Sequence, residues 1–80
     1  MTSSFPAVNS KQVVKVLESI GFVFVRQSGS SHAVYKRLLD QRRTVVPMHG
    51  NTIIKRRTLK SILKDANLTL EEFRSLLNEV

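Results

Sequence analysis

The residues best suited to chemistry form the short turn Gly29-Ser30-Ser31-His32, in which two hydroxyl-bearing side chains precede a histidine. Histidine gains or loses a proton near neutral pH, so it serves as a general acid or base. The two serines offer hydroxyl donors to a phosphate, and Arg26 and Lys36, on either side of the turn, offer positive charge. We therefore predict that His32 is a catalytic residue acting at a phosphate, and that Arg26, Ser30, Ser31 and Lys36 help to bind it.

A second basic cluster is Lys55-Arg56-Arg57, followed by Lys60 one turn into an expected helix. Cations at the start of a helix oppose the positive end of the helix dipole, and a bound anion relieves that repulsion. We predict that Lys55, Arg56, Arg57 and Lys60 contact phosphates of a nucleic-acid backbone. The alternative is that these long side chains simply extend into solvent.

The chain holds one other histidine, His49, in a loop that begins His49-Gly50-Asn51. If the turn between the second and third strands centres near Gln41, antiparallel pairing places His32 opposite residues 49–51. His49 then joins His32 at one end of the sheet and helps to bind the substrate. A loop histidine near a helix entrance, without a catalytic role, is the alternative interpretation.

Charge points to a polyanionic partner. The 80 residues include 13 Lys and Arg against 6 Asp and Glu, a net charge of +7. Residues 1–64 carry 12 basic and 2 acidic side chains, whereas residues 65–80 carry 1 basic and 4 acidic ones. We therefore expect the C-terminal segment to face away from a bound nucleic acid. A merely solvated basic surface is the alternative.

Two classes of hydrolytic chemistry are disfavoured by the scarcity of suitable side chains. There is no cysteine, which excludes disulfides and thiolate metal sites. A two-metal nuclease or a Ser-His-Asp hydrolase needs well-placed carboxylates, and the first 64 residues offer only Glu18 and Asp40. We expect no metal and no cofactor. RNA cleavage avoids both requirements, because the substrate's own 2′-hydroxyl is the nucleophile.

The elements expected to position these groups follow from hydrophobic periodicity and turn signals. A lead-in, residues 1–9, precedes a helix that Ser10 caps and Gly21 ends, and Thr58 caps a second helix over residues 59–66. Thr69 and Glu72 form a capping box for a last helix. Strands are predicted at residues 22–27, 32–39 and 43–48. The prediction is one α+β domain over residues 1–80, in the order α-β-β-β-α-α. Its three-stranded antiparallel sheet has the His32 strand in the middle and helices on one face.

The strands carry apolar residues on both faces, so we expect the outer face of the sheet to be partly exposed and apolar. Such a face commonly binds a protein partner, and Phe24, Tyr35 and Val45 or their strand neighbours are the predicted contacts. Alternatively, the last helix or the N-terminal tail covers it. The N-terminus lacks the features of a signal peptide, so we expect a cytoplasmic location.

Several segments together resemble the HicA family of toxin-antitoxin RNA interferases. The matching segments are Gly21-Phe22, Arg26-Gln27 leading to the Gly29 to His32 turn, Val46-Pro47-Met48-His49-Gly50-Asn51, and Thr58-Leu59-Lys60-Ser61-Ile62-Leu63-Lys64. The resemblance implies a double-stranded-RNA-binding-domain-like fold, His32 as the catalytic histidine, messenger RNA as the substrate and a HicB-type antitoxin that blocks the active site. Ser31 before the histidine and Arg57 in place of a frequent glycine depart from many relatives.

The sequence thus predicts the toxin of a toxin-antitoxin pair, a metal-independent endoribonuclease acting through His32. A non-catalytic RNA-binding module is the main alternative, because the same fold serves both functions. An interaction protein that works only through its outer sheet face is a third possibility, but it would not require cations at the helix entrance.

Overall fold

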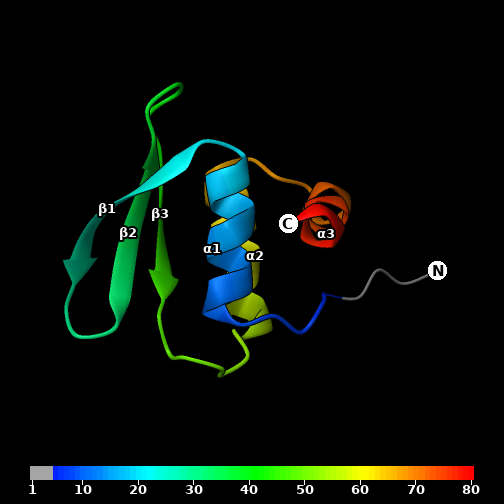
Figure 1. Ribbon diagram of the computed structural model, residues 1–80, viewed down its shortest axis with the longest axis horizontal. Helices are drawn as coiled ribbons and strands as arrows, with labels where there is room; N and C mark the ends of the chain where they lie inside the picture. The colour runs from blue at the N-terminus through cyan, green and yellow to red at the C-terminus, as the bar shows by residue number, and fades with distance from the viewer. Residues whose placement is uncertain (1–4) are drawn as a thin grey trace.

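The protein is built in three layers, as the computed structural model shows for residues 5–80 (Figure 1). A sheet forms the first layer, two helices side by side form the second, and the last helix forms the third. The elements, in chain order, are α1 (Ser10–Ser19), β1 (Phe22–Ser28), β2 (His32–Arg37), β3 (Arg42–Pro47), α2 (Arg56–Ala66) and α3 (Leu70–Glu79). The predicted α+β class and the order α-β-β-β-α-α are confirmed.

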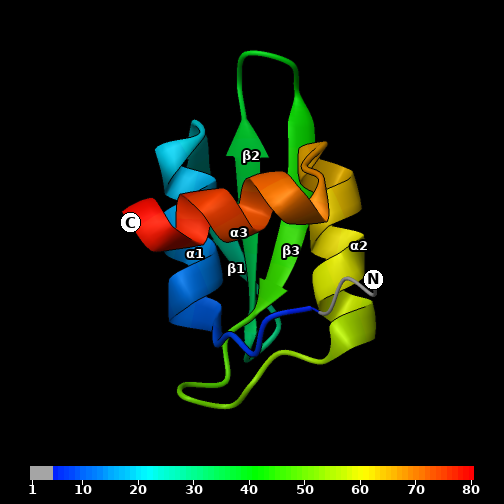
Figure 2. The ribbon, with the colours of Figure 1, turned by 90° about the vertical axis from the view of Figure 1, so that its right-hand side faces the viewer.

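The sheet is an antiparallel meander in the order β1-β2-β3, so the strand that begins with His32 is the central one, as predicted. All three helices lie on one side of it (Figure 1). Helices α1 and α2 run in the same direction along the sheet, and α3 crosses them on the side away from the strands (Figure 2). The suggestion that the last helix covers the outer face of the sheet is therefore wrong.

The register between β2 and β3 differs from the prediction. His32 pairs with Pro47, not with residues 49–51, because the turn occupies residues 38–41 and β2 ends at Arg37. Gln41 adopts a left-handed backbone conformation with φ of 61°, and its side-chain amide donates to the Leu38 carbonyl oxygen at 2.9 Å. These local bonds favour the tighter turn.

A β-bulge in β1 decides which side chains face the helices. Phe24 pairs with Tyr35 and Arg26 with Val34, so Val25 is the extra residue on β1. Since side chains alternate along a strand, an unbulged β1 would direct Arg26 to the helix side with Phe24. The bulge instead turns Arg26 to the outer face.

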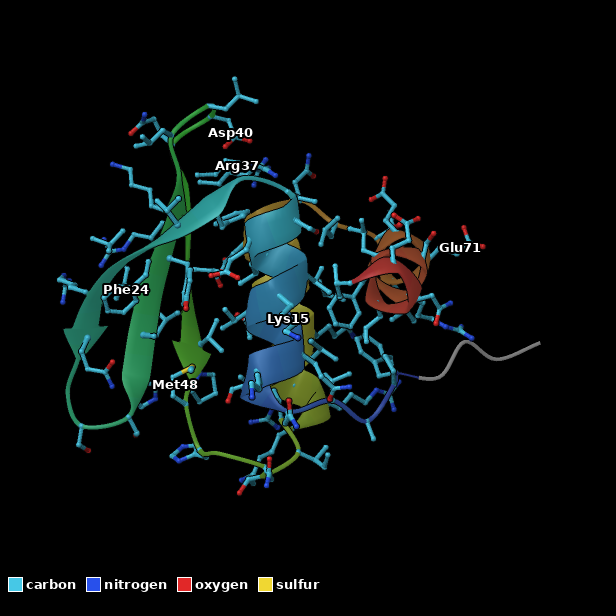
Figure 3. The ribbon with its side chains drawn as sticks, viewed as in Figure 1. Lys15, Phe24, Arg37, Asp40, Met48 and Glu71 are labelled. Atoms are coloured by element: carbon cyan, nitrogen blue, oxygen red, sulfur yellow. The ribbon has the colours of Figure 1, made fainter. Side chains whose placement is uncertain are left out.

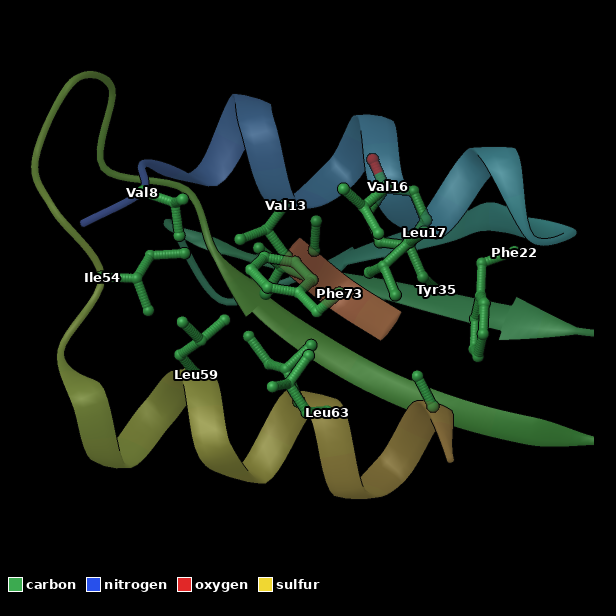
Figure 4. Close-up of a cluster of buried hydrophobic side chains, with 14 residues drawn as sticks. Val8, Val13, Val16, Leu17, Phe22, Tyr35, Ile54, Leu59, Leu63 and Phe73 are labelled. Atoms are coloured by element: carbon green, nitrogen blue, oxygen red, sulfur yellow. The ribbon is translucent and has the colours of Figure 1, made fainter. Parts of the chain in front are cut away.

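The core lies between the sheet and the first helix layer and extends to Phe73 of α3 (Figure 4). Its fully buried members include Val13 and Leu17 of α1, Phe22 of β1 and Leu59 of α2.

Tyr35 belongs to this buried cluster, and the Phe24 ring packs edge-on against the Tyr35 ring with centroids 5.8 Å apart. Burial and the nearby Glu18 carboxylate raise the pKa of the Tyr35 phenol. Phe24, although 55% exposed, therefore lies on the helix side with Tyr35, and the exposed residues of the outer face are Val45 and the strand neighbours Val23 and Val25, the second of the two predicted sets.

Two predicted helix starts are wrong by one to three residues. Asn9, not Ser10, caps α1: its side chain accepts from the Gln12 amide and the Gln12 side chain accepts in return. Helix α2 starts at Arg56, with Lys55 as a cap residue that makes no side-chain cap bond, so Thr58 lies inside the first turn. The capping box of Thr69 and Glu72 at α3 is confirmed.

The predicted lead-in lies partly outside the described residues, namely at 1–4. Its described part has no helix or regular strand, but it is packed against the molecule. Val8 is buried, its carbonyl oxygen accepts from the Ile54 amide at 2.8 Å, and Asn9 forms a β-bridge with Ile53. These contacts hold the loop before α2 in place.

Candidate functional site

A groove of about 390 Å³ lies where the end of β3, the loop before α2 and the start of α2 meet. In Figure 1 this is the lower end of the molecule, where the turn before β2 also lies. The groove is lined by His32, Val45, Pro47, His49, Thr52, Ile53, Ile54, Lys55 and Thr58. Its polar side chains come from the start of β2, from the loop after β3 and from the first turn of α2.

Backbone bonds bring the two histidines together although they are not paired in the sheet. Beyond the last ladder pair, the Met48 amide donates to the Ser31 carbonyl oxygen at 2.6 Å. A turn then follows, closed by the Thr52 amide donating to the His49 carbonyl oxygen at 3.1 Å, and Gly50 within it has φ of 62°. The His32 and His49 rings face each other edge to face with their centroids 6.5 Å apart.

The polar lining of the groove is cationic and hydroxyl-bearing. Lys55 and Thr58 border it at the start of α2, where backbone amides without helical partners carry partial positive charge. No Asp or Glu stands among the described residues that line it. Within residues 5–80, no three His, Asp or Glu side chains gather as a metal site would require. The arrangement can bind an anion and move protons through imidazoles.

A second hollow, of about 170 Å³, lies on the outer face of the sheet. Arg26 and Lys36, both predicted to bind substrate, line it together with Arg43, which was not among the predicted site residues. Side chains at every second position of β2 share one face of the sheet, so this face carries His32, Val34 and Lys36. The outer face therefore carries a row of cations that leads along the sheet towards His32. Val34 also lines this hollow and is buried.

The remaining predicted residues lie outside the groove. Ser30 and Ser31 form the turn before β2, where the Ser31 carbonyl oxygen bonds to Met48 and the Ser30 carbonyl oxygen accepts from Gln27. The Arg56 guanidinium lies 5.2 Å from the centre of the Phe5 ring. The side chains of Arg57 and Lys60 are exposed on α2. Of the predicted set, the groove unites His32, His49 and Lys55.

Three polar lining residues escaped the sequence analysis as site residues: Arg43, Thr52 and Thr58. The signal for Arg43 is its place directly across from Lys36, which only the correct register reveals. Thr58 was interpreted as a helix cap, and a cap side chain turns back towards its own helix. Because α2 starts two residues before Thr58, this residue instead borders the groove.

The chain was compared with models of known protein families. The model of the family described as the HicA toxin of bacterial toxin-antitoxin systems matches residues 10–68. The chain belongs to the HicA family. The match includes every element from α1 to α2 and both histidines, and it ends before α3. No curated protein matches the chain.

Membership of the HicA family makes this protein the toxin component of a toxin-antitoxin system, with an antitoxin as its partner. Within the part of the chain that the structure describes, no helix has the length and apolar content needed to cross a membrane. Within residues 5–80, the groove and the outer face of the sheet both carry basic side chains.

Proposed function

We propose that this HicA toxin is a metal-independent endoribonuclease that cleaves messenger RNA, with His32 as a catalytic residue. The observation that carries the proposal is the groove itself, in which His32 stands beside a second imidazole, the Lys55 ammonium and the Thr58 hydroxyl. Those groups match the needs of RNA transesterification, namely proton transfer and stabilisation of negative charge at phosphorus.

In the proposed reaction, the 2′-hydroxyl of the substrate attacks the adjacent phosphate and the 5′ oxygen leaves. His32 accepts the proton of the 2′-hydroxyl, and Lys55 stabilises the charge on the non-bridging oxygens. The products are a 2′,3′-cyclic phosphate and a 5′-hydroxyl. The RNA backbone is held by side chains around the groove and along the outer face, namely Arg26, Ser30, Ser31, Lys36, His49, Arg56, Arg57 and Lys60, together with Arg43.

The antitoxin in this proposal is a HicB-type protein that covers the groove and excludes RNA. A cationic groove favours a partner with acidic side chains, because complementary charge speeds association. The apolar lining residues Val45 and Ile53, both exposed, offer the contact area that such a partner would bury.

The test compares the wild-type toxin with His32→Ala on RNA in excess EDTA. We expect the wild type to cleave and the variant to lose on the order of 10²- to 10⁴-fold in rate, the usual contribution of an acid-base group. RNA affinity should change little, because affinity depends mainly on phosphate contacts. Asn51→Ala, an exposed loop change outside the groove, is the control and should cleave normally.

Three outcomes would contradict the proposal. Full activity in folded His32→Ala would remove this residue from the chemistry. A strict need for Mg²⁺, or a 5′-phosphate product, would indicate attack by a metal-bound water. Tight binding of RNA without any cleavage by the wild type would favour the non-catalytic RNA-binding module.

A further inference from the structure

The second histidine of the groove, His49, lies beside His32. The turn at residues 49–52 is closed by a backbone hydrogen bond and directs the His49 ring towards His32, with 6.5 Å between ring centroids. The two imidazoles therefore border the same part of the groove. A general base and a general acid act on different oxygens of one phosphate, each over a contact of about 2.6 to 3.2 Å, so a phosphate seated against both rings can contact both imidazoles.

We propose that His49 is a second catalytic residue, the general acid that protonates the 5′ oxygen as it leaves. This inference rests on the proposed function, in which His32 takes the proton of the 2′-hydroxyl. The O2′–P bond forms and the P–O5′ bond breaks, while one proton moves from the 2′-hydroxyl to His32 and another from His49 to the 5′ oxygen. After the step His32 is protonated and His49 is neutral, and exchange with water restores both.

The side chains that line the groove favour His32 as the base and His49 as the acid. Its titratable lining residues are His32, His49 and Lys55, from β2, the loop and the start of α2. In the proposed reaction the Lys55 ammonium stabilises the charge at phosphorus, and imidazole is the side chain that most often transfers protons in general acid-base catalysis. Among the described lining residues, this leaves His49 as the side chain suited to protonating an alkoxide.

The experiment uses RNA in which the 5′ oxygen of one linkage is replaced by sulfur, beside the same RNA with oxygen. A thiolate leaves without being protonated, so a general acid matters only for the oxygen substrate. We expect His49→Ala to lose on the order of 10²- to 10⁴-fold on the oxygen substrate and less than about tenfold on the sulfur substrate. His32→Ala should be slow on both, and Asn51→Ala, in the same turn, should match the wild type on both.

The pH profile supplies a second readout. The wild type should show a bell-shaped dependence, because the base must be neutral and the acid protonated. His49→Ala should lose the fall at high pH and keep the rise at low pH. With His32→Ala the rise at low pH should vanish.

Either of two results would overturn the inference while leaving the proposed function intact. Wild-type rates in His49→Ala on the oxygen substrate would show that no acid acts there. An equal loss on both substrates would show that His49 only positions RNA. If the wild-type protein cleaves neither substrate, the proposed function itself fails, and the inference fails with it.

Discussion

Arg37, at the end of β2, ties the β2–β3 turn to the helix layer. Its guanidinium donates to the Ile20 carbonyl oxygen at 3.2 Å, to the Ala66 carbonyl oxygen at 3.3 Å and to both carboxylate oxygens of Asp40, and it lies 4.8 Å from the centre of the Phe22 ring. Figure 3 shows Arg37 and Asp40 side by side at the end of the sheet remote from the groove. The positive charge of Arg37 at the C-terminal ends of α1 and α2 also interacts favourably with the negative ends of their helix dipoles.

The ion pair between Arg37 and Asp40 depends on an ionised Asp40 carboxylate. The hydrogen bonds from Arg37 hold the pKa of the Asp40 carboxyl below its ordinary value, despite a smaller opposing effect of desolvation. A carboxyl whose pKa is lowered in the folded state contributes stability above its unfolded pKa. That contribution is lost as the pH falls through the folded value.

We predict that Arg37→Met lowers the free energy of unfolding by about 2 kcal/mol or more, because hydrogen bonds of a charged group contribute about 1.5 to 3 kcal/mol each. Methionine keeps most of the aliphatic stem, so the loss reports mainly on the guanidinium. Urea unfolding monitored by circular dichroism measures it. Leu39→Ala, at a side chain 91% exposed in the adjacent turn, is the control and should stay within about 0.5 kcal/mol of wild type. Equal stability of Arg37→Met and the wild type would contradict the prediction.

At the scale of elements, α2 begins in an electrostatically unfavourable way. Its cap residue Lys55 makes no side-chain cap bond, and its first turn carries Arg56 and Arg57 with no acidic residue. By contrast, α3 begins with a capping box and with Glu71 and Glu72 in its first turn. The first turn of α2 is basic and uncapped, whereas that of α3 is acidic and capped. An anion-binding site at the start of α2, and none at the start of α3, accounts for this difference.

Arg57→Glu should therefore change stability and RNA binding in opposite directions. An acidic residue in the first turn of α2 should raise the free energy of unfolding by about 0.3 to 1 kcal/mol at low salt. The same change should weaken RNA binding about equally for all sequences, and the loss of each phosphate contact should reduce the slope of log affinity against log salt by about 0.7. Filter binding at several salt concentrations and urea unfolding measure the two effects.

Arg74→Glu on α3 is the matched control, because it makes the same change of charge on an exposed helical residue of the third layer. It should leave the salt slope unchanged. Unaltered RNA binding and slope in Arg57→Glu would mean that the cluster only extends into solvent.

At the scale of the whole molecule, the layers separate charge. The outer face of the sheet presents Arg26, Lys36 and Arg43, whereas Glu71 and Glu72 stand on α3, beyond the first helix layer (Figures 1 and 3). The acidic residues of α3 therefore lie on the side of the molecule away from the basic outer face of the sheet.

We predict that an antitoxin binds over the groove and the outer face, so that Arg43→Glu slows its association severalfold whereas Arg74→Glu does not. Arg43 lies on β3 beside Val45, which is 40% exposed and borders the groove. Surface plasmon resonance at low and moderate salt, with a HicB-type antitoxin immobilised, measures the association rates. A larger effect from Arg74→Glu would move the interface to the α3 side.

The sequence by itself determined what depends on neighbours along the chain. The order of the elements, the turn that ends in His32 and the capping box at Thr69 follow from periodicity and from side chains three residues apart. Patterns of this kind act through bonds within one turn of helix or one hairpin, so a single sequence displays them. The central place of β2 followed because both of its connections are short.

Only the tertiary structure decided what depends on contacts between distant segments. The bulge at Val25 turns Arg26 outward, the register places Arg43 beside Lys36, and the bond between Met48 and Ser31 precedes the turn that brings His49 to His32. A shift of one residue in strand pairing exchanges the faces of the sheet, and packing of a whole face against a core selects the register. Likewise, Phe5, which is distant in sequence, packs against the guanidinium of Arg56, the first residue of α2. The groove exists because the β3 end, the loop pinned by Val8 and the start of α2 meet in space, and no local pattern encodes that meeting.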